Sequence, residues 1–321
     1  MKQLSLTWNV ICRKYLFLIF LLFLVLIGDY QSGYGQSSPK RVIIDTDTYN
    51  EIDDQFALVY ALASQSAMQV EAIYAAPFHN ARSTGPKDGM LKSHEEILRL
   101  LDLIGMESEG LVFKGSESFM TDTSVPVPSE AAEDLIKRAL ESPDTLYVLT
   151  LGAPTNVASA IVKEPKIKDK IKVIWLGGKG LTWHTAYEFN LKQDIPASQV
   201  LFDSGVPLVQ VPTEPVSSHL TTTLPELKAY LQGKSKIADY LLHIFEDYHS
   251  DHYAYAKVIW DIAVIAYMVN PKWLPTEHRS TPILTDELTY RFDESRNPYT
   301  MVYFVDRNPV FKDLFQKLAK F

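Results

Sequence analysis

A short apolar strand that runs directly into a group of aspartates constrains this chain more than any other stretch. Residues 42–44 (Val-Ile-Ile) are β-branched and predict a buried strand, and Asp-Thr-Asp follows at 45–47. Apolar residues then recur at helical spacing from Phe56 to Ala63, so a helix is expected to begin close to position 53. A strand end, a tight loop and a helix start therefore bring together the carboxylates of Asp45, Asp47, Asp53 and Asp54.

This acidic group predicts a metal site. No Lys or Arg occurs between Arg41 and Arg82 to neutralise it. Carboxylates crowded into a cleft must take up protons or bind a cation. The donors are oxygens without His or Cys, which favours Ca²⁺ or Mg²⁺ over Zn²⁺. For Asp53 alone, simple capping of the helix is the alternative interpretation.

The first 35 residues have the pattern of a secretory signal peptide. Three basic residues (Lys2, Arg13 and Lys14) precede or open an apolar run, 15–27, and Gly-Tyr-Gly at 33–35 offers a cleavage site. An uncleaved anchor is the alternative, although the run is short for a bilayer. We expect an exported protein, periplasmic or secreted, whose mature chain is one domain over residues 36–321. Since Cys12 is the only cysteine, the mature chain would have no disulfide.

Charge argues against nucleic acid as a partner. The whole chain has 31 basic and 39 acidic residues, and without the leader 28 and 38 remain, a formal charge of −10. The chain has no long basic run, so no electrostatic footprint for nucleic acid is expected. We also expect no membrane association once the signal is removed.

Alternation of apolar strands and amphipathic helices predicts an α/β fold. It indicates a mostly parallel, Rossmann-like central sheet with helices on both faces, in which ligands bind beyond the carboxyl ends of the strands. A C-terminal hairpin (289–292 with 300–305) and a terminal helix (309–318) are expected to close the chain. The other predicted strands are 70–75, 146–149, 172–176 and 208–211, and the other predicted helices are 88–103, 129–142, 156–162, 196–204 and 262–269.

Three later stretches fall where that sheet edge should be. Leu149–Asn156 ends a strand in a Gly-containing turn that can direct a backbone carbonyl at a ligand, although it could be simple turn chemistry. Glu188 and Asn190 would project the same way from an extended segment, and a surface loop explains them equally well. Trp260-Asp261 opens an apolar helix, where an aspartate is usually capped, paired or metal-bound.

Taken together, these pieces resemble the inosine-uridine-type nucleoside hydrolases over nearly the whole mature chain. That family has a D-x-D-P-G-x-D-D element after its first strand, then G-P-L-T-N, E-F-N and a late His-Asp pair. The matching segments here are 45–54, Gly152–Asn156, 188–190 and 260–261. Four pieces in the right order make the resemblance specific.

The resemblance implies N-glycosidic hydrolysis of ribonucleosides with a Ca²⁺-bound water. Asp47, which would also be the catalytic base, would hold the ion together with Asp54, Asp261 and the carbonyl of Leu151. About eight oxygens, including ribose hydroxyls, suit Ca²⁺ better than Mg²⁺.

The same resemblance implies the substrate contacts. Asp53 would hold a ribose hydroxyl, and Glu188 and Asn190 would bind the ribose from the other side. Asn80 or His79 would be a weaker further contact. Asp45 would brace the loop. Members of the family are usually dimers or tetramers, so a homo-oligomer is expected.

Three departures from the family pattern bear on the leaving base. The loop between Asp47 and Asp53 is two residues longer, and residues 183–185 lack the asparagine that often precedes E-F-N. Trp260 replaces the family histidine, which resembles the purine-preferring branch, where aromatic stacking activates the base; a core tryptophan is the alternative. His184 and His252 are the only nearby candidates for a replacement acid.

Two other functions remain open on the sequence. Residues 42–48 also fit the D-x-D-x-T motif of haloacid-dehalogenase-type phosphatases, with Asp45 as nucleophile and Mg²⁺ as cofactor. That interpretation leaves Asp53-Asp54 and Glu188-x-Asn190 unexplained. A secreted Ca²⁺- and ribose-binding protein without turnover is the second alternative.

Overall fold

The central sheet of the computed structural model is built from parallel strands. The structure describes residues 38–321, so the expected signal peptide lies outside the described residues. The main strands are β1 (Lys40–Thr46), β2 (Met68–Ala75), β3 (Val112–Lys114), β4 (Leu146–Thr150), β5 (Ile171–Leu176), β6 (Leu208–Val211), β9 (Thr276–Ser280) and β12 (Pro298–Val302). They form one eight-stranded sheet in the order β3-β2-β1-β4-β5-β6-β12-β9. All neighbours pair in parallel except β12 and β9, which confirms the predicted mostly parallel sheet.

The strand order reverses direction between β1 and β4. From β1 the chain moves outward through β2 and β3, then returns to place β4, β5 and β6 on the other side of β1. In doubly wound sheets such a switch point opens a crevice at the carboxyl ends of the two strands. The segments that follow β1 and β4 are therefore expected to carry the binding site.

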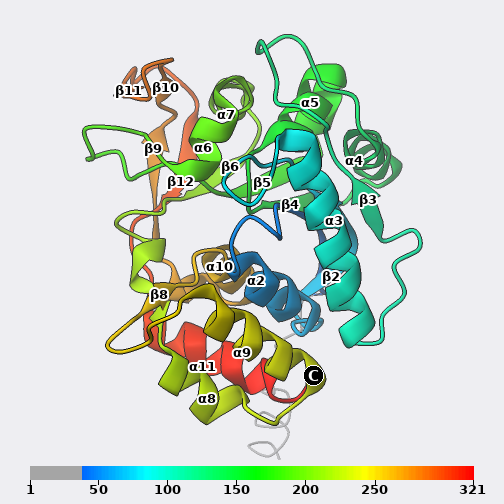
Figure 1. Ribbon diagram of the computed structural model, residues 1–321. Coiled ribbons are helices and arrows are strands. Elements are labelled where there is room, and N and C mark those ends of the chain that lie inside the picture. Colours follow the sequence, from blue (N-terminus) through cyan, green and yellow to red (C-terminus); the bar gives the residue numbers. More distant parts are fainter. Residues whose placement is uncertain (1–37) are drawn as a thin grey trace, which may run out of the picture. The chain divides into compact units, whose positions relative to one another are not determined.

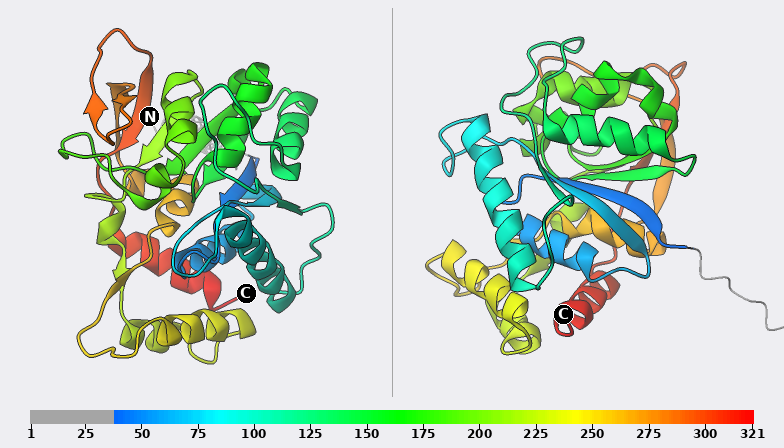
Figure 2. Two further views of the ribbon diagram at one scale, coloured as in Figure 1. Left: turned by 45° about the horizontal axis from the view of Figure 1, so that its top comes forward. Right: turned by 90° about the vertical axis from the view of Figure 1, so that its right-hand side faces the viewer.

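Helices cover both faces of the sheet, as Figures 1 and 2 show. Residues with alternate orientation in β1 divide between two cores, with Val42 and Ile44 in one and Ile43 in the other. On the first face lie α2 (Asp53–Leu62), α3 (Pro86–Leu103), α8 (Leu224–Leu231), α9 (Lys236–Tyr248), α10 (Ile262–Val269) and α11 (Arg307–Leu318). On the second lie α4 (Glu130–Glu141), α5 (Thr155–Lys163) and α7 (Ile195–Asp203).

Two helices beside the switch point are unusually buried. All ten residues of α2 are buried, including Asp53 and Asp54 in its first turn. The apolar helix α10 packs against α2 and begins directly after Asp261. Acidic side chains thus enter the core at two helix starts that face the same strand ends.

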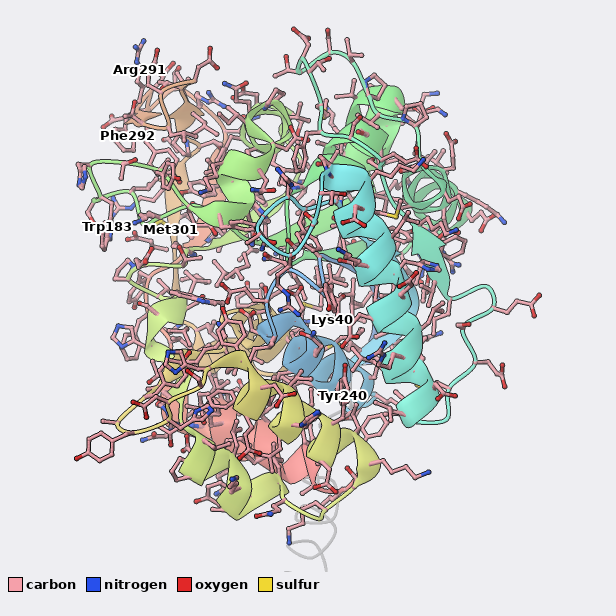
Figure 3. The ribbon with its side chains drawn as sticks, in the orientation of Figure 1. Lys40, Trp183, Tyr240, Arg291, Phe292 and Met301 are labelled. Carbon is pink, nitrogen blue, oxygen red and sulfur yellow. The ribbon has the colours of Figure 1, made fainter. Side chains whose placement is uncertain are left out.

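Tyr240 of α9 points toward α3, where its hydroxyl donates to Glu96 (Figure 3).

The predicted C-terminal hairpin is wrong in its pairing. Residues 290–291 form β11 (Tyr290–Arg291), which pairs with β10 (Ile283–Leu284), not with 300–305. β12 instead joins the main sheet between β6 and β9. The terminal helix α11 is confirmed. Short elements complete the chain: α6 (Phe189–Gln193), the pair β7 (Thr221–Thr222) and β8 (Lys257–Val258), and three 3₁₀ turns.

Within residues 38–321, none of the helices combines the length and apolar character that crossing a bilayer requires.

Candidate active site

Four buried aspartates converge at the switch point. Asp47 follows β1, Asp53 and Asp54 open α2, and Asp261 immediately precedes α10. Each is at most 3% exposed. Carboxylate oxygens of Asp53, Asp54 and Asp261 all lie within 4.8 Å of one another. The structure therefore brings Asp261 to the acidic group across more than 200 residues of sequence.

The oxygens of this cluster have few protein partners. Among the described residues, neither carboxylate oxygen of Asp47 has a hydrogen-bond partner, and Oδ1 of Asp261 has none either. Asp54 accepts from the Thr46 hydroxyl, and Asp53 accepts from the Trp260 amide at 3.2 Å. Buried carboxylate oxygens without donors are costly unless a cation or proton satisfies them. The donor set, all oxygen, fits a hard divalent cation.

The electrostatics of the aspartate cluster also favour a bound cation. Burial raises the pKa of the Asp47, Asp54 and Asp261 carboxyls well above the ordinary value, and repulsion from the neighbouring aspartates raises each pKa further. Without a cation, the ionised cluster opposes folding. A divalent ion among the carboxylates would remove both the desolvation cost and the repulsion.

Asp47 is seated against a glycine of the neighbouring strand's turn. A Cβ atom at Gly152, which follows β4, would lie 2.8 Å from Cγ and Oδ1 of Asp47. The Leu151 amide donates to the Asp45 carbonyl at 2.7 Å, which holds the two turns together. Only glycine leaves room for the carboxylate at this distance. The Gly-containing turn singled out in the sequence therefore shapes the seat of Asp47.

Asp45 lies behind the cluster and does not line the cavity. It is fully buried, and its Oδ1 accepts from Asn156 Nδ2 at 2.8 Å. Burial raises its pKa to about 7, and the Asn156 bond partly opposes that rise. Asn156 in turn accepts from the Ser116 amide and hydroxyl at 2.8 and 2.9 Å. An aspartate enclosed in this way cannot meet a phosphoester, so the structure gives no support to the phosphatase alternative.

Asn190 binds two strand ends. Its side-chain amide donates to the carbonyls of Leu151 and Leu176 at 2.6 and 3.0 Å, which ties the ends of β4 and β5 together. Both leucines line the cavity. The Leu151 carbonyl keeps a second lone pair for a ligand. The structure thus places Leu151 and Asn190 in direct contact at the edge of the cavity.

The segment from Glu188 to Asn190 is not extended, so the shared projection that an extended segment would give does not apply. Glu188 caps the short helix α6, and its carboxylate accepts from the amides of Gly178, Asn190 and Leu191 at 2.9 to 3.0 Å. Glu188 still lines the cavity, although it is only 8% exposed. The helix start satisfies the carboxylate internally, which the two-residue spacing could not reveal.

Asn80 stands one layer behind the cavity. Its Nδ2 donates to Asn50 Oδ1 at 2.6 Å, and Asn50, from the lengthened loop, is the residue that lines the cavity. Arg82 holds the same loop by donating to the Glu51 carbonyl at 2.8 Å. His79 is exposed and absent from the lining. Asn50, and not Asn80, therefore lines the cavity at this point.

Trp260 is half-buried: it packs against the main core and also lines the cavity. No histidine is found among the described residues that line it. His184 is exposed, and His252 stacks on Phe245 while its Nε2 contacts the Glu246 carbonyl. The two histidines proposed as replacement acids therefore lie outside the lining.

The cavity has a volume of about 340 Å³, and cationic residues that the sequence did not single out line part of it. Lys179, after β5, and Lys192, on α6, both contribute to the wall. Near the acidic cluster, Glu51 of the lengthened loop forms an ion pair with the buried Lys257. Glu51 and Asp53 help to raise the pKa of Lys257 despite its burial, so this lysine stays protonated.

Comparison with known proteins relates this geometry to one family. Residues 42–308 match the family described as "Inosine-uridine preferring nucleoside hydrolase". The chain is 28% identical over 317 residues to the pyrimidine-specific ribonucleoside hydrolase RihA of Klebsiella pneumoniae, an alignment that covers 87% of this chain and 98% of that protein.

Solved structures share the fold. A plant nucleoside hydrolase, PpNRh1, superposes with a TM-score of 0.70 at 22% identity, covering 88% of this chain and 99% of that one. The purine-preferring ribonucleoside hydrolase from Gardnerella vaginalis gives 0.68 at 22% identity, with 88% and 99% coverage.

Proposed function

Because the chain belongs to the inosine-uridine preferring nucleoside hydrolase family, and is thus a hydrolase of N-glycosyl bonds, we propose that it cleaves ribonucleosides to free base and ribose with Ca²⁺ as cofactor. The observation that carries this proposal is the set of buried, unpartnered oxygens on Asp47 and Asp261 at the sheet's switch point. Residues arranged in this way need a cation and surround a cavity large enough for a nucleoside.

Asp47, Asp54, Asp261 and the Leu151 carbonyl would hold the ion. When bound, Ca²⁺ supplies positive charge that lowers the pKa of a water and neutralises the carboxylates. Asp47 has two oxygens without protein donors, so one can accept the proton of the water that attacks C1′. Gly152 fixes that carboxylate from behind.

Asp53 is oriented by the Trp260 amide, which leaves its other oxygen to accept from a ribose hydroxyl. Its negative charge would also stabilise the positive, oxocarbenium-like sugar as the glycosidic bond breaks. Glu188 and Asn190 form the wall beside the sugar, and Asn80 acts by positioning Asn50. Each role is a proposal for a residue whose place in the site is described above.

Trp260 would stack on the departing base. Every base has a π-face, so this contact alone does not select purines. The purine preference expected from Trp260 finds no support among the curated relatives compared, which are named pyrimidine-specific. We therefore propose that the chain hydrolyses both purine and pyrimidine ribonucleosides. Comparing the rates for the individual nucleosides measures which base is preferred.

We also propose that the working form is the exported chain from Gln36 onward, assembled as a homo-oligomer. Size-exclusion chromatography with light scattering on secreted material tests both statements.

The test of function is product analysis. The chain from 36 to 321 is incubated with inosine, guanosine, adenosine, uridine and cytidine, with Ca²⁺ or with chelator, beside Asp47→Asn. Equimolar base and ribose that require Ca²⁺ and Asp47 support the proposal. Calcium binding without product from any nucleoside refutes it in favour of a binding protein, and phosphate release from a phosphoester panel would restore the phosphatase.

A further inference from the structure

The wall of the cavity next to α6 carries two lysines. Lys179 and Lys192 line the cavity, and neither forms an ion pair with the aspartates of the metal cluster in the part of the chain that the structure describes. The cavity therefore has a wholly acidic region at the aspartates and a mixed region in which Lys179 and Lys192 stand beside Glu188 and Glu214. A neutral nucleoside needs only the first.

Lys192 is the less neutralised of the two lysines. No carboxylate within residues 38–321 lies within 4.0 Å of its Nζ. It donates to the Tyr187 hydroxyl at 2.7 Å and lies 4.4 Å from the centre of that ring. The ammonium keeps further N–H donors, and the Tyr187 hydroxyl, which accepts from Lys192, is left free to donate its own proton. These groups together form a donor set for an anion.

Lys179 forms an ion pair with an acidic residue. Its Nζ lies 3.4 Å from Glu214 and 4.6 Å from the centre of the Trp183 ring. Glu214 also accepts from the Thr213 hydroxyl at 3.1 Å, so it has a second partner inside the protein. Lys179 thus offsets Glu214, which also lines the cavity, and among the described residues of this wall Lys192 is the lysine without a carboxylate partner.

Glu188, by contrast, has no need of a substrate hydroxyl. Its two oxygens already accept three backbone amides. With the sugar held over the aspartates and beside α6, the lysines and Tyr187 offer spare hydrogen-bond donors on this wall. A phosphate on the 5′-oxygen is an anion of matching charge, and lysine is a usual phosphate partner.

We propose that the enzyme accepts nucleoside 5′-monophosphates, with Lys192, Tyr187 and Lys179 binding the 5′-phosphate. This inference rests on the proposed function, because the same N-glycosidic bond is broken. Water adds to C1′ and gives a proton to Asp47, the C1′–N bond breaks, and the departing base takes up one proton, so that no proton is gained or lost overall. The products are free base and ribose 5-phosphate, and the phosphoester bond remains intact.

The experiment compares inosine with inosine 5′-monophosphate and uridine with uridine 5′-monophosphate, with ribose 5-phosphate measured directly. The readout is the ratio of kcat/KM for nucleotide over nucleoside. Loss of one charged hydrogen-bond donor predicts a fall of about tenfold in this ratio for Lys192→Gln. Lys192→Arg keeps the charge and should retain most of the ratio, and Lys87→Gln, on the exposed surface of α3, should not change it.

Failure of the 5′-phosphate inference can be distinguished from failure of the proposed function. Hydrolysis of nucleosides without any ribose 5-phosphate from nucleotides would overturn this inference and leave the proposed function intact. A ratio that is the same for Lys192→Gln and wild type would also overturn it. If neither substrate class is cleaved, the proposed function fails, and calorimetric binding of ribose 5-phosphate decides: binding that Lys192→Gln weakens supports the phosphate site, and its absence overturns it.

Discussion

Replacing Gly152 by alanine tests the seat of the proposed catalytic base. The new Cβ would stand 2.8 Å from Cγ and Oδ1 of Asp47, whereas ordinary contacts begin at 3.4 Å. The carboxylate or the turn after β4 must therefore move by about 0.6 Å. The backbone at Gly152 is not in the left-handed region, so the effect comes from the contact alone.

The expected cost follows from that displacement. Because misplacement of a catalytic group by ~1 Å costs about a hundredfold in rate, kcat/KM should fall about ten- to a hundredfold in Gly152→Ala. Overpacking of a tight site should also lower the free energy of unfolding by about 1–3 kcal/mol. The assay is ribose release under saturating Ca²⁺, together with calorimetric Ca²⁺ affinity and a melting curve.

Gly85→Ala is the matched control. Gly85 precedes α3 with an extended backbone, and a Cβ there meets nothing within 4 Å. This variant should keep wild-type activity and Ca²⁺ affinity. If Gly152→Ala matches it in both, the packing of Asp47 against Gly152 has no part in catalysis and the reasoning is refuted.

Three further predictions concern the metal, the support behind it and the base. In chelator, the melting temperature should fall as pH rises above 3.8, because the raised pKa values of Asp47, Asp54 and Asp261 make the folded state bind more protons than the unfolded state. Ca²⁺ at a hundred times its Kd should restore about 2.7 kcal/mol of the free energy of unfolding near neutral pH. A melting temperature that depends neither on pH nor on Ca²⁺ would contradict this prediction. Asn156→Ala removes the donor to the buried Asp45 carboxylate and should lower the free energy of unfolding, measured by chemical denaturation, by about 1–3 kcal/mol. Asn156→Gln keeps an amide donor, so any loss of stability in that variant would have a different cause. Trp260→Ala should lower kcat/KM about five- to a hundredfold for both base classes through lost stacking, whereas Trp260→Phe should retain much of the activity; equal activity in all three proteins would exclude stacking.

The strand-to-helix aspartates could be predicted from the sequence because the signals are local. A β-branched strand and an amphipathic helix are each set by nearby residues, and they position Asp47, Asp53 and Asp54 without long-range information. For Asp261, the start of a fully apolar helix indicated only that the aspartate needs a partner, and its place beside the other aspartates was implied by the family resemblance.

The failures concern contacts between distant segments. β12 pairs with β6 about 90 residues earlier, and no pattern within 298–302 specifies that neighbour, so a local hairpin was expected instead. The helix that begins at Phe189 could not be predicted, because a five-residue helix is too short to show its periodicity. The two lysines of the cavity wall were missed because Lys179, in the turn after β5, and Lys192, on α6, line one cavity only in the folded chain.

Calcium titrated into chelator-treated protein, with ribose release followed in the same samples, tests whether a bound calcium ion is required for hydrolysis. We expect about one ion bound per chain, activity that rises in proportion to occupancy, and loss of both in Asp261→Asn, a change of nearly equal volume that removes one ligand charge. Undiminished ribose release in chelator, or tight calcium binding that survives Asp261→Asn, would contradict this expectation.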